Sequence, residues 1–295
     1  MAAKRNRPWL TGHTVRAQLR LPPAPTARRQ VTGGPGARRP TVRTTIGITG
    51  ALLATVFLAG AVRAAHRGEP PAPLRAGGVP VIVELFSSEG CSSCPPADTW
   101  LASLDRTQPI EGVSVIALEE HVDYWDRLGW RDPFGQPQFG ERQAEYARAL
   151  ADKRTYTPEI VLDGTSTVQS GDADQTARDL RASASQPRAH VGLSREGDRV
   201  RVDVLDRPGS EDVEVWLAVT ESGLSTDVPQ GENAGRHLAH APVVRVLRKL
   251  GVASVSPVHV ETVVALDPAW AASSLRYVAF VQQTRSRRIV GANAF

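Results

Sequence analysis

Cysteine is scarce in this sequence: the 295 residues contain two, Cys91 and Cys94, both in the stretch VELFSSEGCSSCPPAD. Two cysteines are too few for a disulfide-rich scaffold. A structural zinc site normally takes four ligands, and the sequence offers no second Cys pair or matching His pair at a suitable spacing. The pair therefore needs another explanation.

Acidic residues are absent from the first 45 residues, which carry ten Lys and Arg side chains. The other residues carry 25 basic and 31 acidic side chains, so the high pI of about 9.4 comes from this leader and not from the folded part. A nucleic-acid-binding function inferred from the pI would be mistaken. We expect no nucleic-acid partner and a disordered leader over residues 1–45.

No uncharged apolar run reaches the roughly 20 residues of a typical membrane-spanning helix. The longest candidate, residues 46–62, follows the basic leader and is followed by small residues that suit a cleavage site. We expect residues 46–65 to be a signal peptide or a membrane anchor, with the basic side in the cytoplasm. Either alternative predicts a periplasmic or secreted protein, with a membrane contact if the segment is not cleaved.

The remaining chain divides into three expected parts. Residues 66–78 are rich in Pro, Gly and Ala and are typical of a linker. Residues 79–186 alternate apolar strands with amphipathic helices, including a strand–turn–strand with Asp-Gly at the bend, and predict an α/β domain. Residues 187–295 contain about seven short strand patterns and predict a small all-β sandwich.

Cys91 and Cys94 lie where a buried strand is expected to end and a helix to begin. Pro95 and Pro96 follow, and proline is tolerated in the first helical turn, so the helix should start at the cysteines. Unpaired N–H groups at that end lower the pKa of a thiol. The pattern favours a redox pair over a metal clip or a structural disulfide, since closing so short a loop removes only about 2 kcal/mol of unfolded-state entropy.

The order of elements resembles the thioredoxin fold: strand, CxxC, helix, strand, helix, X-Pro, hairpin and last helix. That resemblance implies that Pro158 is a cis proline packed against the cysteine pair and that the backbone of Thr157 binds substrate. A proline at the first residue of an ordinary strand would give the same local pattern.

Five motifs together resemble an exported bacterial family, domain-of-unknown-function family 1223: VELFSSEGCSSCPPAD, HVDYWDRLGWRDPF, ERQAEYARAL, YTPEIVLDG and GENAGRHLAHAPVVR. The resemblance implies a thioredoxin-like domain followed by a C-terminal β domain, and it gives a plausible site without a substrate. The chain departs from the family in the acidic pair Glu119-Glu120 before the His-Val-Asp motif.

Three further residues are candidates for the site. Glu84 is an acid inside an apolar strand, where burial would raise its pKa and let it exchange protons with Cys94, unless it points to water or to an Arg. His121 follows the second strand and could contact Cys91, hold copper together with both cysteines, or be satisfied in a small aromatic core. His237 and His240 suit a capping, interdomain or ligand-binding role equally well.

The sequence as a whole predicts an exported thiol–disulfide oxidoreductase that acts on protein thiols or disulfides through Cys91 and Cys94, without an organic cofactor. The alternatives are a copper-binding protein that uses Cys91, Cys94 and His121, and a non-catalytic adaptor with the same fold.

Overall fold

The computed structural model describes residues 69–151 and 154–295. The expected leader (1–45) and signal or anchor segment (46–65) lie outside this range, as do the first three residues of the expected linker. No helix in the described part of the chain is long and apolar enough to cross a bilayer. The described residues belong to one compact unit.

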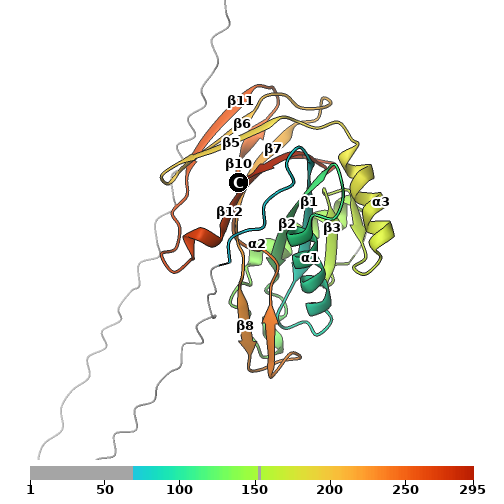
Figure 1. The fold of residues 1–295 in the computed structure, drawn as a ribbon, viewed down its shortest axis with the longest axis vertical. Coiled ribbons are helices and arrows are strands. Elements are labelled where there is room, and N and C mark those ends of the chain that lie inside the picture. Colours follow the sequence, from blue (N-terminus) through green and yellow to red (C-terminus); the bar gives the residue numbers. More distant parts are fainter. Residues whose placement is uncertain (1–68, 152–153) are drawn as a thin grey trace, which may run out of the picture. The chain divides into compact units, whose positions relative to one another are not determined.

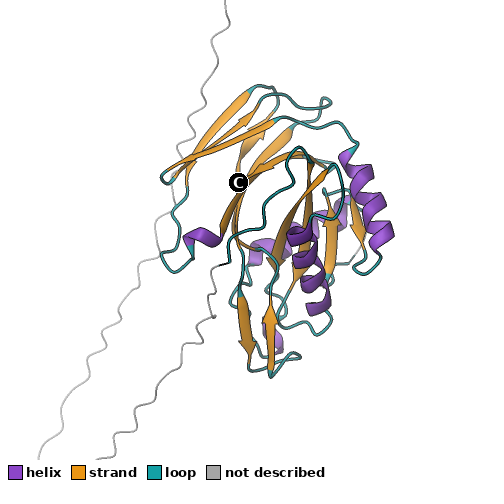
Figure 2. Cartoon of the chain, viewed as in Figure 1, coloured by secondary structure: helices purple, strands orange, loops and turns teal. Residues whose placement is uncertain are grey.

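Within the described residues, three α-helices and two short 3₁₀ helices accompany the strands, arranged as in Figures 1 and 2. The helices are α1 (Pro95–Thr107), α2 (Pro137–Ala149) and α3 (Ala173–Ala184). The strands are β1 (Val79–Ser87), β2 (Val113–His121), β3 (Glu159–Leu162), β4 (Ser166–Val168), β5 (Val191–Glu196), β6 (Arg199–Val204), β7 (Val213–Glu221), β8 (Ser225–Val228), β9 (Arg236–Ala239), β10 (Val243–Ala253), β11 (Val258–Val263), β12 (Leu275–Gln283) and β13 (Ile289–Ala294).

The expected fold class, a thioredoxin-like domain followed by a separate β-sandwich, is wrong. Eight strands form one mixed sheet in the order β13-β12-β7-β10-β2-β1-β3-β4, so strands from both expected domains belong to the same sheet. The junction is the parallel pairing of β10 with β2 at Val243 and Glu119, next to the hydrogen bond from Glu119 N to Pro242 O. All nine residues of β2 are buried, and its second edge is covered by β10.

A second contact joins the two halves of the chain. The turn between β3 and β4 contains Asp163 and Gly164, and the backbone N–H of Ile289 donates to Asp163 O. Gly164 has φ +68°, and a Cβ at this position would overlap the backbone carbonyl of Arg287. Glycine is therefore required here both for the turn and for close packing against the C-terminal hairpin.

The helices cover opposite faces of the sheet. Leu101 of α1 and Leu180 of α3 pack with Val83 and Val115 on one face. Helix α2 covers the other face, where Tyr146 joins a second apolar cluster with residues of β1, β2 and the C-terminal strands. A three-stranded sheet, β11-β6-β5, packs on the C-terminal strands of the large sheet and buries a third cluster (Figure 1).

The hairpin β8–β9 is the element that the sequence did not predict. Its strands are four residues each, and it is joined by the loop 229–235. The hairpin extends away from the large sheet, at the lower end of the molecule in Figure 1, and contacts α1. This contact brings the segment GENAGRHLAH to the cysteines.

Candidate functional site

The two cysteines form a disulfide at the start of α1. Their Cα atoms lie 5.5 Å apart, and Cys94 is the N-cap residue of the helix, with Pro95 as its first residue. Cys91 N donates to Ser88 O and Cys94 N donates to Cys91 O, which closes two successive turns after β1. The expected helix start is confirmed, and the disulfide faces the positive end of the helix dipole.

The loop of the β8–β9 hairpin is hydrogen-bonded to the backbone of the cysteine turn. Cys91 is 1% exposed and Cys94 is 0% exposed, although Ser92 between them is exposed. Buried Asn233 donates two hydrogen bonds from Nδ2, to Glu89 O at 2.8 Å and to Cys91 O at 2.9 Å. Glu232 Oε2 accepts a hydrogen bond from Ser92 N at 3.1 Å, and hydrogen bonding with the side chain and then the backbone of Ser92 lowers the pKa of Glu232. The loop is thus attached to the cysteine turn at three points.

The peptide bond between Thr157 and Pro158 is cis, which confirms that part of the prediction. Strand β3 begins at Glu159, which lies opposite Phe86 of β1. Thr157 and Pro158, which come just before β3, therefore lie at the end of β1 from which the cysteine turn departs. Trp125 links them to this turn: its Nε1 donates to Thr157 Oγ1 at 2.8 Å, and its Cβ packs against Gly90.

Glu84 is buried, as one alternative expected, and it points to an arginine, as the other alternative allowed. Arg142 Nε donates to Glu84 Oε1 at 2.5 Å, and the Tyr146 hydroxyl donates to Glu84 Oε2 at 2.5 Å. The α1-facing residues of β1, such as Val83 and Leu85, alternate with Glu84, which therefore points to the α2 side of the sheet. On the α1 side, Asp98 Oδ1 accepts a hydrogen bond from Ser87 Oγ at 2.6 Å.

His121 lies in a buried cluster of acids and a second histidine. Its Nδ1 is 2.7 Å from Asp132 Oδ2, and its Nε2 is 3.1 Å from Glu119 Oε1. His240, which follows β9, packs edge-on against the His121 ring, with ring centroids 5.0 Å apart. His240 Nε2 is 3.1 Å from Glu89 Oε1, and His240 Nδ1 is 3.5 Å from Glu119 Oε1.

The carboxylates determine the charge of these histidines. Burial alone would lower the pKa of His121, but Asp132 and Glu119 outweigh it and raise that pKa well above its usual value. Burial opposes protonation of His240 too, yet Glu119 and Glu89 raise its pKa to about 9. Burial likewise disfavours the charged form of Glu119, but its two histidine partners lower its pKa to about 2. The pKa values of His121, His240 and Glu119 are thus all shifted toward the charged forms, although all three side chains are buried.

Comparison with known proteins identifies the family. The family model described as "Protein of unknown function (DUF1223)" matches residues 82–282, which is more than half of the chain. The chain belongs to this family. The match spans the cysteine pair, the cluster around His121 and the β8–β9 hairpin, so all of these features lie within the DUF1223 region.

A solved structure resembles this DUF1223 protein closely enough to compare folds. The crystal structure of a protein from Agrobacterium tumefaciens aligns with a TM-score of 0.56 at 28% identity, over 74% of this chain and 94% of that chain. A hypothetical protein from Pyrococcus horikoshii aligns at a TM-score of 0.19 and 10% identity, over 37% of this chain and 85% of that one, which supports no argument. The curated proteins contain no match.

The structure does not bring together the copper ligands considered from the sequence. Cys91 and Cys94 are bonded to each other, and both ring nitrogens of His121 face carboxylates. Among the described residues, the group of potential ligand atoms that lie within 4.8 Å of one another is Glu119, His121 and His240.

Sequence reasoning missed several residues of the DUF1223 site. Asn233 reads as a turn residue in the sequence, Glu89, Asp132 and Glu232 carry no signal of their own there, and the role of His240 is left open between capping, interdomain contact and ligand binding. The available signal was their presence in the family motifs. Exposed His237, by contrast, pairs with exposed Asp227 and lies outside the cluster.

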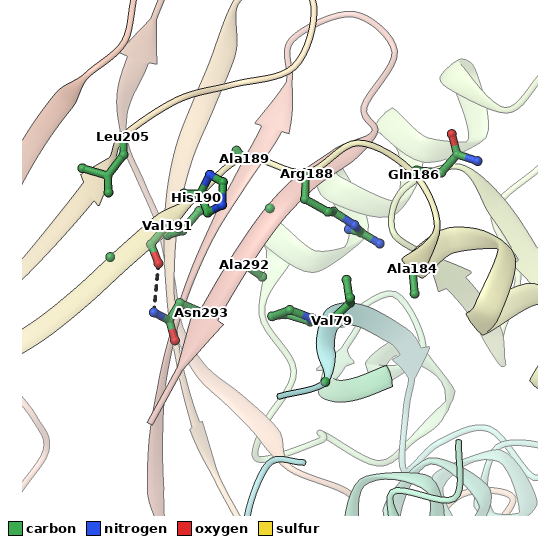
Figure 3. A pocket seen from close by; sticks show the side chains of 14 residues that line it. Val79, Ala184, Gln186, Arg188, Ala189, His190, Val191, Leu205, Ala292 and Asn293 are labelled. Atoms are coloured by element: carbon green, nitrogen blue, oxygen red, sulfur yellow. Dashed lines mark hydrogen bonds between the residues drawn. The ribbon is translucent and has the colours of Figure 1, made fainter. Parts of the chain in front are cut away.

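A pocket elsewhere on the molecule involves none of these residues. It has a volume of about 740 Å³ and is lined by Val79, Ala189, Val191, Leu205 and Asn293, among others (Figure 3). Asn293 Nδ2 donates to Val191 O across its wall at 2.9 Å (Figure 3). Its side chains offer no nucleophile near a base, so the cysteine turn is the better candidate site.

Proposed function

We propose that this protein is an exported thiol–disulfide oxidoreductase that uses Cys91 and Cys94 to exchange electrons with protein thiols or disulfides. The observation that carries the proposal is the disulfide between these cysteines at the start of α1. A disulfide across two intervening residues contributes little to the stability of the fold. At a helix N-terminus, however, the thiolate that forms when the disulfide is reduced is stabilised.

The exchange reaction balances without a cofactor. A partner thiolate attacks Cys91 Sγ, the Sγ–Sγ bond breaks, and Cys94 leaves as a thiolate that takes up a proton. A second partner thiolate then attacks the partner sulfur of the mixed disulfide and releases Cys91. The partner loses two electrons and two protons to form its disulfide, and the cysteine pair gains them. The reverse sequence reduces a partner disulfide.

Both cysteines are buried and the loop 229–235 is hydrogen-bonded to the backbone of their turn, so movement of this loop is the proposed route of access to Cys91. The hydrogen bonds that attach this loop go to the backbone of the cysteine turn. Opening therefore breaks a few polar contacts and leaves the apolar core of the sheet intact.

A glutathione redox titration of the purified full chain tests the proposed function. We expect a reversible two-electron transition of Cys91 and Cys94, followed by alkylation and mass analysis at each glutathione ratio. The control is the Cys91→Ser/Cys94→Ser variant, which should show no transition. A pair that stays oxidised over the whole range, or that reduces irreversibly with unfolding, would contradict the proposal.

Substitution of Asn233 tests the role of the loop. Asn233→Ala removes two buried hydrogen bonds to the cysteine turn, each worth about 1 kcal/mol. Together they correspond to about 2 kcal/mol. Because about 1.4 kcal/mol changes an equilibrium constant tenfold, the population of molecules with the loop open should rise roughly thirtyfold. We expect reduction of the disulfide by dithiothreitol to accelerate by about this factor. Gln230→Ala, an exposed change in the same loop, is the control and should have no effect; equal rates for both variants would show that the loop is no barrier.

A further inference from the structure

We infer that Glu119, His121 and His240 form a binding site for a divalent transition-metal ion, separate from the disulfide and independent of the proposed redox function. Two imidazoles and one carboxylate are a ligand set that zinc uses in catalytic sites, with a fourth position for another ligand. All three side chains are at least 99% buried. They come from the end of β2 and from the residue that follows β9, so the two halves of the chain meet at the site.

The spacing of the three donors suits a small ion. In a tetrahedral zinc site with bonds of about 2.0–2.1 Å, neighbouring ligand atoms lie roughly 3.3–3.4 Å apart. Glu119 Oε1 is 3.1 Å from His121 Nε2 and 3.5 Å from His240 Nδ1. The three donor atoms all lie within 4.8 Å of one another, so the side chains would adjust to bring them to bonding distance of one ion.

The outward nitrogen of each histidine already has the carboxylate partner that is typical of a metal ligand. His121 Nδ1 pairs with Asp132, leaving Nε2 directed at Glu119. His240 Nε2 pairs with Glu89, leaving Nδ1 directed at the same carboxylate. Such outer carboxylates fix the orientation of the ring and increase its basicity toward a metal. Asp132 is held in turn by the backbone N–H groups of Glu89 and Phe134.

Two donor atoms of the site lack hydrogen-bond partners among the described residues. They are His240 Nδ1 and Glu119 Oε2, and both are buried. A buried polar atom without a partner costs free energy. An ion held by Glu119 Oε1 and the two imidazoles would satisfy His240 Nδ1, and it would satisfy Glu119 Oε2 as well if the carboxylate bound it through both oxygens. Three carboxylates, those of Glu89, Glu119 and Asp132, surround the two imidazoles. A divalent cation would displace the protons carried by His121 Nε2 and His240 Nδ1, since only a deprotonated ring nitrogen binds a metal, and its charge would take their place beside these carboxylates.

The nitrogen and oxygen donors favour zinc or a similar first-row ion over magnesium or calcium, which prefer oxygen ligands alone. Cysteine sulfur is absent from the set, which distinguishes this site from a copper site built on the CxxC pair.

Titration of the metal-free full chain with Co²⁺ and Zn²⁺ tests the site. We expect one equivalent of Co²⁺ to give the visible absorption of a four- or five-coordinate centre and Zn²⁺ to displace it. His240→Ala should weaken Zn²⁺ binding by more than about 100-fold, the upper end of the loss caused by removing an outer partner. His237→Ala, an exposed change three residues away, is the matched control and should bind normally.

Two further variants separate this site from its alternatives. Asp132→Asn should weaken Zn²⁺ binding by about 10- to 100-fold, since it perturbs the orientation of His121 without removing a ligand. The Cys91→Ser/Cys94→Ser variant should bind Zn²⁺ as tightly as the original chain. Circular dichroism verifies that each variant is folded, and His121→Gln replaces His240→Ala if the latter does not fold. Three results would overturn the inference. They are stoichiometric Zn²⁺ binding that survives loss of either histidine, Zn²⁺ binding that depends on the cysteines, and no Zn²⁺ binding to the folded chain.

Discussion

In cells that produce the Cys94→Ala variant, non-reducing gels are expected to show mixed disulfides between this protein and its partners, whereas Cys91→Ala should show none. Cys91 is the residue that the exchange reaction places in contact with a partner, since it precedes the helix and lies next to exposed Ser92. Cys94 is fully buried at the N-cap of α1 and is suited to resolve the intermediate. When Cys91 attacks a partner disulfide, Cys94 is the thiol that attacks the resulting mixed disulfide and frees the partner, so without Cys94 this mixed disulfide persists.

The control for this trapping experiment is Ser92→Ala, which keeps both cysteines and the backbone N–H that binds Glu232. It should trap no more than the original chain. Adducts formed by Cys91→Ala in place of Cys94→Ala would reverse the two roles. Absence of adducts in both variants, in an oxidising compartment, would argue against exchange with proteins.

Replacement of Arg142 by Met is expected to destabilise the fold by about 3–5 kcal/mol, the usual cost of removing one partner of a buried ion pair. Arg142 is 4% exposed and donates to Glu84, Tyr146 and Gln282, with hydrogen bonds of 2.5, 2.7 and 3.1 Å. Its guanidinium lies over the rings of Tyr146, Trp216 and Phe280. Without it, the Glu84 carboxylate is buried and uncompensated. Chemical denaturation of the full chain measures the loss.

Two further variants make the test of Arg142 specific. Arg148→Met changes an exposed arginine on the same helix and should alter stability by less than about 0.5 kcal/mol. The double variant Arg142→Met/Glu84→Met should recover part of the loss, because no buried charge remains unpaired. Burial and the adjacent Glu84 raise the pKa of neighbouring Glu120 well above its usual value, which disfavours a second negative charge there. A loss for Arg142→Met no larger than that for Arg148→Met would contradict this account.

The end of β2 shows how far sequence reasoning can reach. Alternation along the strand places Glu119 and His121 on the α1 face and Glu120 on the α2 face, where it meets Glu84. The sequence therefore indicated a functional strand end, and it singled out His121. It did not show that Glu119 and Glu120 belong to two separate networks, because that division depends on Arg142 and His240, which lie 22 and 120 residues further along the chain.

The hairpin β8–β9 is the element that the local sequence pattern most clearly failed to predict. Its strands, STDV and RHLA, are short and mostly polar, so no periodicity marks them. The hairpin is stabilised by pairing between its own strands and by long-range contacts such as that of Asn233 with the cysteine turn, 142 residues away. A reader of the sequence sees turn residues there, and only the fold shows that they are hydrogen-bonded to the turn that holds the disulfide.

The sequence by itself determined the local structure: the start of α1 at Cys94, forced by two prolines; the β3–β4 turn at Asp163-Gly164; and most of the strands, from their apolar patterns. These features depend on neighbours within a few residues. Only the tertiary structure decided that β10 pairs with β2, which replaced two separate domains by one eight-stranded sheet. Alternation reveals which side of a strand is buried but not which strand lies beside it. The same long-range pairing carries His240 to Glu119 and the loop 229–235 to Cys91, so the composition of the site followed from the order of the strands.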